Sequence, residues 1–104
     1  MAENSCCCCS GNEKTTERDE DLKRNLLNRL KRIEGQIRGL ERMVENDAYC
    51  NDILTQSAAA GSALDSFNSV LLEAHIRGCV VRDIKNGDTE IISELCDTVR
   101  KLIK

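Results

Sequence analysis

The only histidine of this 104-residue chain, His75, lies four residues before a cysteine in the stretch Leu71-Leu-Glu-Ala-His-Ile-Arg-Gly-Cys79. In an α-helix, positions i and i+4 stack on one face, about one turn apart. An imidazole and a thiolate placed in this way can hold one soft metal ion between them. Two ligands make a weak site, so the sequence predicts a third ligand from elsewhere.

Cys50 is the candidate for the third ligand, and its distance along the chain has a consequence. It precedes His75 by 25 residues (75 − 50), which is roughly 37 Å if both lie on one helix. No single ion bridges that distance within one chain. A second copy packed antiparallel would bring its own Cys50 to His75 and Cys79, with the crossing near residues 63–64. Small residues fill Ser57–Ala63 at that level, so the spacing predicts a twofold dimer with two equivalent intersubunit sites.

The proposed donor set of two thiolates and one imidazole is soft and low in coordination number. Cu(I) suits it, while Zn(II) remains an alternative that normally takes a fourth protein ligand in a structural site. A ligating histidine usually donates its other N–H to an acceptor, so Tyr49 and a carboxylate from the last helix are the expected outer partners. Cysteine is also common as a small buried hydrophobic residue. We interpret Cys96 in that way, as a core cysteine.

The composition indicates one small all-α domain. The chain has no Pro or Trp, one Phe and one Tyr, 32% charged residues, and apolar residues at helical spacing. Such a chain buries a modest core, so oligomerisation is expected. Seven cysteines exclude a complete disulfide framework, and there is neither a signal-peptide segment nor an apolar run of membrane-spanning length. We expect a cytoplasmic protein with reduced thiols and no membrane partner.

The net charge of −3 conceals a segregation of charge along the chain. Residues 1–21 carry six acids and two bases, whereas residues 22–44 carry seven bases and two acids. The bases of the second segment are Lys23, Arg24, Arg29, Lys31, Arg32, Arg38 and Arg42. This segment is either a solvated charged face or a surface for the phosphates of nucleic acid.

Three helices are expected to position these residues. The first should begin near Thr16, with Thr16-x-x-Asp19 as a start resembling a capping box, and end near Glu45-Asn46. Its apolar seam consists of Leu22, Leu26, Leu30, Ile33, Ile37, Leu40 and Val44. Steps of three and four residues are typical of a seam that packs on another helix. Gly35 and Gly39 each cost a helix about 1 kcal/mol relative to Ala, so we expect another backbone to approach closely there.

The second helix is predicted from about Ala48 to Lys85, with Asp47 as its N-cap. Cys50 would then lie in the first turn, where the helix dipole favours a thiolate. Asn86-Gly87 is the expected stop, with Gly87 in the left-handed conformation. A third helix follows over about 89–103, capped by Asp88 or Thr89.

Residues 1–16 are polar and acidic without apolar periodicity, which predicts a disordered tail before a helical domain at 17–104. The tail contains Cys6, Cys7, Cys8 and Cys9. A flexible cluster of thiols can chelate a soft ion, so these residues are either an accessory metal site or an incidental feature.

Three stretches together resemble the copper-sensitive operon repressor family. They are Asn28-Arg-Leu-Lys-Arg-Ile-Glu-Gly-Gln-Ile-Arg-Gly-Leu-Glu-Arg-Met43, Asp47-Ala-Tyr-Cys-Asn-Asp-Ile-Leu-Thr-Gln56 and His75-Ile-Arg-Gly-Cys79. The resemblance covers about residues 20–104. Relatives respond to nickel or cobalt, formaldehyde or sulfane sulfur and differ at the ligand positions, whereas Cys50, His75 and Cys79 match the copper(I)-sensing pattern.

The resemblance implies a three-helix protomer that pairs as an antiparallel helical dimer with a core like a four-helix bundle, and a homotetramer built as a dimer of dimers. The apo form would repress copper-export genes by binding operator DNA. Cu(I), held in trigonal geometry across the dimer, would release the DNA. Tyr49 and Glu94 match the outer-partner positions of the family.

On the DNA side, Arg29 and Lys31 match basic residues that the family uses, and we add Arg32 and Arg38 from the same segment. Ser66 is a departure, because some members carry at this position an arginine implicated in DNA binding. The family has no helix-turn-helix reader, and this sequence contains none.

Two other functions remain open from the sequence. One is a repressor of the same family that responds to sulfane sulfur, with a persulfide bridge between Cys50 and Cys79 of two chains, although His75 argues against it. The other is a Cu(I) buffer or chaperone that uses the N-terminal cysteines. An enzyme is not expected, because no companion acid–base group lies at useful spacing and there is no Gly-rich phosphate loop.

Overall fold

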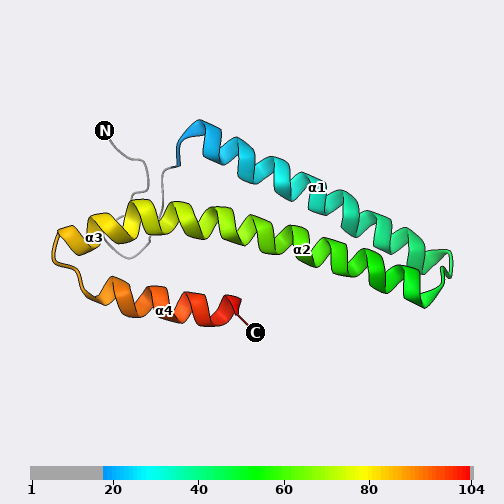
Figure 1. Cartoon of the computed structure of the whole chain (residues 1–104). Coiled ribbons are helices and arrows are strands. Elements are labelled where there is room, and N and C mark those ends of the chain that lie inside the picture. Colours follow the sequence, from blue (N-terminus) through cyan, green and yellow to red (C-terminus); the bar gives the residue numbers. More distant parts are fainter. Residues whose placement is uncertain (1–17, 104) are drawn as a thin grey trace. The chain divides into compact units, whose positions relative to one another are not determined.

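The computed structural model describes residues 18–103, and every regular element within them is helical (Figure 1). The elements in chain order are α1 (Glu20–Glu45), α2 (Cys50–His75), the π-helical turn η1 (Ile76–Val80), α3 (Val81–Lys85) and α4 (Glu90–Leu102). Because α2, η1 and α3 follow one another without an intervening loop, they form one continuous helical segment. The predicted all-α class with three helices is confirmed.

The chain divides into two compact units. The first is Asp21–Val70, which contains α1 and most of α2, and the second contains Leu71 onward, with the end of α2, η1, α3 and α4. Among the described helices, none combines the length and the apolar character that crossing a bilayer requires.

In the first unit, α1 and α2 form an antiparallel hairpin (Figure 1), and the predicted apolar seam of α1 divides into two rows. One row is shielded, with Leu26 buried and Ile33 and Leu40 half-buried. The other row consists of Leu30, Ile37 and Val44, which are 36%, 46% and 61% exposed. Positions four residues apart differ by about 40° around a helix, so one partner helix covers the first row and leaves the second row open.

The connection between α1 and α2 ends α1 with a Schellman motif. The Ala48 N–H donates to the Met43 carbonyl at 2.9 Å, and the Asp47 N–H donates to the Val44 carbonyl at 3.2 Å. Asp47 has a φ of 56°, the left-handed conformation that this motif requires at the residue after the cap. The prediction that Asp47 is the N-cap of the second helix is therefore wrong, because this residue closes α1 instead.

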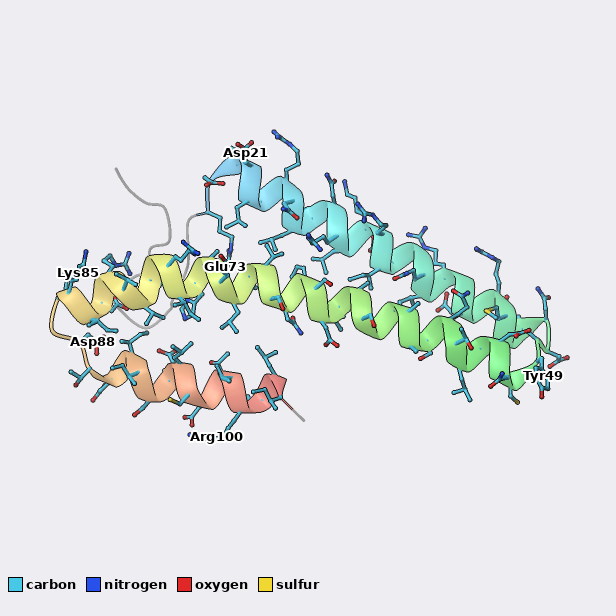
Figure 2. The ribbon with its side chains drawn as sticks, viewed as in Figure 1. Asp21, Tyr49, Glu73, Lys85, Asp88 and Arg100 are labelled. Atoms are coloured by element: carbon cyan, nitrogen blue, oxygen red, sulfur yellow. The ribbon has the colours of Figure 1, made fainter. Side chains whose placement is uncertain are left out.

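The second helix accordingly begins two residues later than predicted, at Cys50. The Tyr49 carbonyl accepts the first hydrogen bonds of α2, from the Asp52 N–H at 3.0 Å and the Ile53 N–H at 3.2 Å. Tyr49 itself lies at the turn between the two helices (Figure 2). Cys50 remains in the first turn of the helix, as expected.

The turn between α3 and α4 repeats the hydrogen-bond pattern of the connection between α1 and α2. The Asp88 N–H donates to the Asp83 carbonyl at 2.9 Å, and the Gly87 N–H donates to the Ile84 carbonyl at 3.0 Å. Gly87 has a φ of 89°, so the predicted stop is confirmed. The carboxylate of Asp88 then accepts the Glu90 N–H at 3.0 Å, which caps the start of α4.

The predicted start of the first helix is wrong, because α1 begins at Glu20 and Arg18 and Asp19 precede it without helical structure. An aspartate directly before the helix suits the cap position and the positive end of the helix dipole. The predicted tail at residues 1–16 and its cysteines at 6–9 lie outside the described residues, so the disordered tail and the accessory metal site stay predictions.

Candidate metal centre and basic surface

Cys50 is positioned as the first residue of α2, directly after the turn that ends α1. Its thiol side chain is exposed, and the neighbouring Tyr49 is 72% exposed. The hairpin therefore presents a sulfur and a phenol to solvent at the start of α2. The described part of one chain provides no enclosure for an ion at this place.

His75 and Cys79 lie together in the second unit, at the other end of α2. His75 is the last residue of α2 and is half-buried, whereas Cys79 lies in η1 with no exposed surface. Val80, which follows it, and Ile91 of α4 are each 3% exposed. The side chain of Cys79 is thus part of the small core where α4 packs against η1.

A π-helical turn separates the two candidate ligands, where the sequence predicted an uninterrupted α-helix. The Val81 N–H donates to the Ile76 carbonyl five residues earlier. A turn closed in this way holds more residues than an α-turn, and such turns occur often at functional sites. Four residues are slightly more than one turn of an α-helix and slightly less than one turn of a π-helix, so His75 and Cys79 lie near the same side of the helix in either case. The π-helical turn is therefore compatible with the predicted pairing, which stays a prediction.

The described residues contain no group of three or more His, Cys, Asp or Glu side chains that could hold a metal ion. Cys50 and His75 are the first and last residues of α2, about 37 Å apart along its axis from the helical rise. Within the described residues, His75 and Cys79 therefore lie at and just after one end of α2 and Cys50 lies at its other end.

Cys96 differs from its predicted role as a core cysteine, because its side chain is exposed on α4. The inward face of this helix is occupied by Ile91, which is buried, and by Leu95 and Val99, which are half-buried. Cys96 follows Leu95 by one residue, or about 100° of rotation, which turns it toward solvent.

The predicted outer partners of the metal lie in different units. Tyr49 is adjacent in sequence to Cys50 at the start of α2, and Glu94 is on α4 in the unit that contains His75 and Cys79. Their assignment stays a prediction that rests on the resemblance.

The predicted DNA-contacting bases lie on α1. Lys31, Arg32 and Arg38 are exposed, while Arg29 is half-buried. The Arg29 Nε donates to the Asn25 Oδ1 at 2.8 Å. Within the described chain, none of these four cations lies within salt-bridge distance of a carboxylate; the ion pair on α1 there is Arg24–Asp21. These four charges are therefore not neutralised by neighbours.

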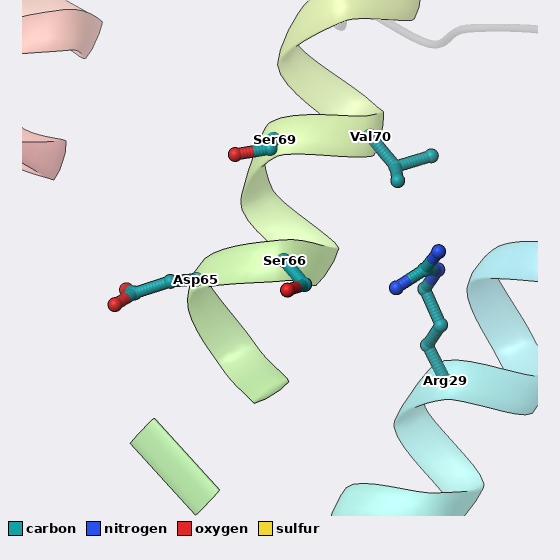
Figure 3. Close-up of a pocket in the computed structure, with 5 residues that line it drawn as sticks. All are labelled: Arg29, Asp65, Ser66, Ser69 and Val70. Atoms are coloured by element: carbon teal, nitrogen blue, oxygen red, sulfur yellow. The ribbon is translucent and has the colours of Figure 1, made fainter. Parts of the chain in front are cut away.

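Two open pockets lie along the α1–α2 hairpin, and sequence reasoning missed both. The smaller, of about 360 Å³, is lined by Arg29, Asp65, Ser66, Ser69 and Val70 (Figure 3). The larger, of about 590 Å³, includes Arg32, Gly35, Gln36, Gly39 and Gln56. Gln36 could have been found from its position in the sequence, because it continues the steps of three and four between Ile33 and Leu40.

In the larger pocket the expected close approach to the glycines is not made within one chain. A Cβ at Gly35 or at Gly39 would meet no atom within 4 Å. The Gln36 Oε1 is buried and has no hydrogen-bond partner among the described residues. This side of α1 is therefore open for a further occupant.

The chain is similar in sequence and in fold to known metal-sensing repressors. The family model described as a metal-sensitive transcriptional repressor matches residues 22–101. The copper-sensing transcriptional repressor CsoR of Bacillus subtilis is 52% identical over 80 residues, which is 76% of this chain and 79% of that protein.

Two solved structures are similar in fold. The copper-sensing repressor CsoR with Cu(I) from Geobacillus thermodenitrificans superimposes with a TM-score of 0.81 and 41% identity, covering 86% of this chain and 95% of that one. The nickel-responsive transcriptional regulator InrS gives a TM-score of 0.66 and 36% identity, covering 77% of this chain and 91% of that one.

Proposed function

Because the chain belongs to the metal-sensitive transcriptional repressor family, we propose that it is a copper(I)-responsive repressor that acts on DNA in the cytoplasm. The observation that carries the proposal is the placement of Cys50 at the first residue of α2, and of His75 and Cys79 at and just beyond its last. The copper-sensing relatives named above support the choice of metal.

Cys50 of one protomer, with His75 and Cys79 of its partner subunit, would hold the ion. Two sulfur donors and one nitrogen donor fit the soft Cu(I) ion better than harder ions. Tyr49 and Glu94 would be the outer groups that orient these ligands. Since each chain carries both halves, a twofold dimer contains two such sites.

The open surfaces of α1 and α2 support the proposal that a second copy of the chain packs against them. The exposed row Leu30, Ile37 and Val44 recurs every seven residues, as in the contact stripe of a helical bundle. On α2, the small residues Ser57, Ala58, Gly61 and Ser62 are exposed, so another helix could approach closely there. We propose an antiparallel dimer through these faces and a dimer of dimers as the DNA-binding form.

Operator DNA would be held through its phosphates by the α1 bases Arg29, Lys31, Arg32 and Arg38. Contacts of this kind make affinity fall steeply with salt. Closing Cys50 onto His75 and Cys79 of the partner subunit would shift the two basic faces relative to each other. If copper binds more tightly to the arrangement that does not fit DNA, then by linkage it lowers DNA affinity by the same factor.

The test is an anaerobic Cu(I) titration of the protein already bound to operator DNA, followed by fluorescence anisotropy. We expect wild-type protein to release the DNA, while His75→Ala binds DNA normally and does not release it. Cys96→Ala is the matched control and should behave as wild type. Unchanged DNA affinity of the wild type in the presence of Cu(I) would refute the proposal. Release by Ni(II) or by sulfane sulfur alone would indicate a different inducer.

A further inference from the structure

A second row of apolar side chains runs along α4, beside the row that faces the core of the second unit. Ile92 and Ile103 of this row are 46% and 69% exposed, and Cys96 is exposed as well. Val99 is half-buried and lies between the two rows. These residues follow one another in steps of four, three and four, the spacing of a seam that packs on another helix. We call Ile92, Cys96, Val99 and Ile103 the outer seam.

The charges of α4 are ordered along its length. Its acids Glu90, Glu94 and Asp97 lie within residues 90–97, and its bases Arg100 and Lys101 lie in the last turn. In a parallel pair of such helices, like charges lie side by side. In an antiparallel pair, the acidic part of each helix lies beside the basic part of the other, which is favourable. The same order suits the dipole of a single helix, so the charges select the orientation of a partner helix and the outer seam supplies the contact.

The outer seam matches a second copy of itself in this antiparallel orientation. With a twofold axis beside residues 97–98, Ile92 of each helix lies beside Ile103 of the partner subunit, and Cys96 lies beside Val99 of the partner subunit. Ile103 directly follows α4, and its N–H donates to the Val99 carbonyl at 3.0 Å, so the seam keeps its helical path to the last residue. A second copy of α4 therefore fits both the apolar pattern and the charge pattern of this face.

The outer seam is separate from the surfaces that the proposed dimer and copper site use. Glu94 is two residues from both Ile92 and Cys96, which is about 200° of rotation around the helix, so it lies on the opposite flank of α4. The exposed apolar row of α1 lies in the first unit and not in the second. A contact through the outer seam is therefore compatible with the proposed dimer and leaves Glu94 available to the copper ligands.

We propose that α4 pairs antiparallel with α4 of another copy through the outer seam, and that this pairing joins two dimers into the tetramer. The inference rests on the proposed dimer of dimers and extends it, because it assigns the contact between the dimers. One pairing of helices of 13 residues buries little area and is weak. Two dimers can form two such pairings at once, and each pairing raises the effective concentration for the other. A movement of Glu94 on copper binding would move the same helix and so change the contact between dimers.

The first test measures the dimer–tetramer equilibrium of the reduced apo protein by analytical ultracentrifugation, in the full chain. Ile92→Gln/Ile103→Gln should weaken the association of dimers by about tenfold or more, as is usual when central contacts of an interface are lost. Ser93→Gln/Thr98→Gln, at exposed positions of α4 outside the seam, is the matched control and should assemble as wild type. Circular dichroism checks that both variants keep their helices, and Cu(I) binding per dimer should be unchanged in both.

The second test reads the orientation of the two helices from cross-links. In Ile92→Cys/Ile103→Cys the two new thiols are about 16 Å apart along one helix, too far for a disulfide within the chain. Glutathione disulfide is the oxidant: the two thiols lose their hydrogens as it is reduced to two molecules of glutathione. Antiparallel pairing predicts a bond between position 92 of one chain and position 103 of the other, identified by mass spectrometry of the linked peptides. Bonds that join 92 to 92 and 103 to 103 would show a parallel pair and overturn the proposal, as would the absence of any cross-link between these positions.

The remaining outcomes of the ultracentrifugation each decide the proposal. It is refuted if wild type does not assemble beyond the dimer, if Ile92→Gln/Ile103→Gln remains as tetrameric as wild type, or if the control dissociates to the same extent. Dissociation of the seam variant into monomers would place the outer seam in the dimer contact instead. A wild type that pairs through α4 but keeps its DNA affinity in Cu(I) would refute the proposed copper response and leave the pairing standing.

Discussion

The two ends of α2 are built in opposite ways. At its start, Cys50 is exposed and its neighbour Tyr49 is 72% exposed. At its other end, His75 is half-buried, and Cys79 lies without exposed surface in a π-helical turn covered by α4. One end thus presents an exposed thiol, and the other combines a half-buried imidazole with a fully buried cysteine side chain.

This difference indicates unequal roles for the two halves of the proposed metal site. A pair held within a packed unit can be ordered before any ion arrives, whereas an exposed thiol acquires surroundings only when another surface covers it. Occupancy of the site then depends on how two chains are arranged. That dependence is what couples metal binding to a change in quaternary structure.

The largest expected effect is on copper binding when a ligand is removed. Cys50→Ala and His75→Ala should each lower Cu(I) affinity by more than the roughly 10- to 100-fold that loss of an outer partner costs. Competition with a Cu(I) chelator measures this affinity. Cys96→Ala, at the exposed cysteine of α4, is the control. Equal affinity for Cys50→Ala and wild type would mean that the open end takes no part in the site.

A smaller loss of Cu(I) affinity is expected when an outer partner of the ligands is replaced. Tyr49→Phe and Glu94→Gln should each weaken Cu(I) binding by roughly 10- to 100-fold and leave the affinity of the apo protein for DNA unchanged. The same chelator competition, run beside DNA anisotropy, checks both quantities. A change in apo DNA affinity of similar size would show that these residues shape the DNA-binding form instead.

In the absence of metal, substitutions at the two ends of α2 should change the free energy of unfolding to different extents. Cys79→Ser places a hydroxyl in a site without exposed surface and should lower the free energy of unfolding by roughly 1–3 kcal/mol. Cys50→Ser changes an exposed side chain and should stay within about 0.5 kcal/mol. Urea denaturation of the reduced apo protein measures both. Equal effects would contradict the contrast in burial.

The smallest effects concern the turns before α2 and after α3, which share one hydrogen-bond pattern but differ at the left-handed residue. Gly87→Ala should destabilise the protein by about 1–2 kcal/mol, because a Cβ is unfavourable at a φ of 89°. Asp47→Gly should stabilise it by about 1 kcal/mol or less, because glycine has no Cβ to oppose a positive φ, and the gain is small because aspartate tolerates this conformation better than most residues. Thermal unfolding of the two variants checks the signs, and a loss of stability in Asp47→Gly would point to a further role for its carboxylate.

Much of this architecture follows from local rules in the sequence. The end of α1 at Glu45, the stop at Asn86-Gly87 and the position of Cys50 in a first turn were predictable, because turn residues and helical periodicity act over a few neighbours. The start of α1 and the role of Asp47 were not. An aspartate can cap the helix that follows or close the helix that precedes, and the φ of 56° decides between the two.

The features that sequence reasoning missed depend on contacts between helices. Periodicity placed Leu30, Ile37 and Val44 in one seam with Leu26, Ile33 and Leu40, but it does not tell which row a single partner helix covers. The π-helical turn between His75 and Cys79 has no residue signature that distinguishes it from an α-turn. The smaller pocket of the hairpin likewise depends on which side chains of α2 lie beside Arg29 of α1.

The central claim is that each copper site takes Cys50 from one chain and His75 and Cys79 from another. It is tested most directly by co-refolding Cys50→Ala protein with Cys79→Ala protein, neither of which has an intact site alone, and measuring tight Cu(I) binding of the mixture. Shared sites predict that the mixture regains binding, because each heterodimer contains one complete set of ligands. If the mixture binds no more Cu(I) than the two variants do separately, each site is made within one chain and the claim is wrong.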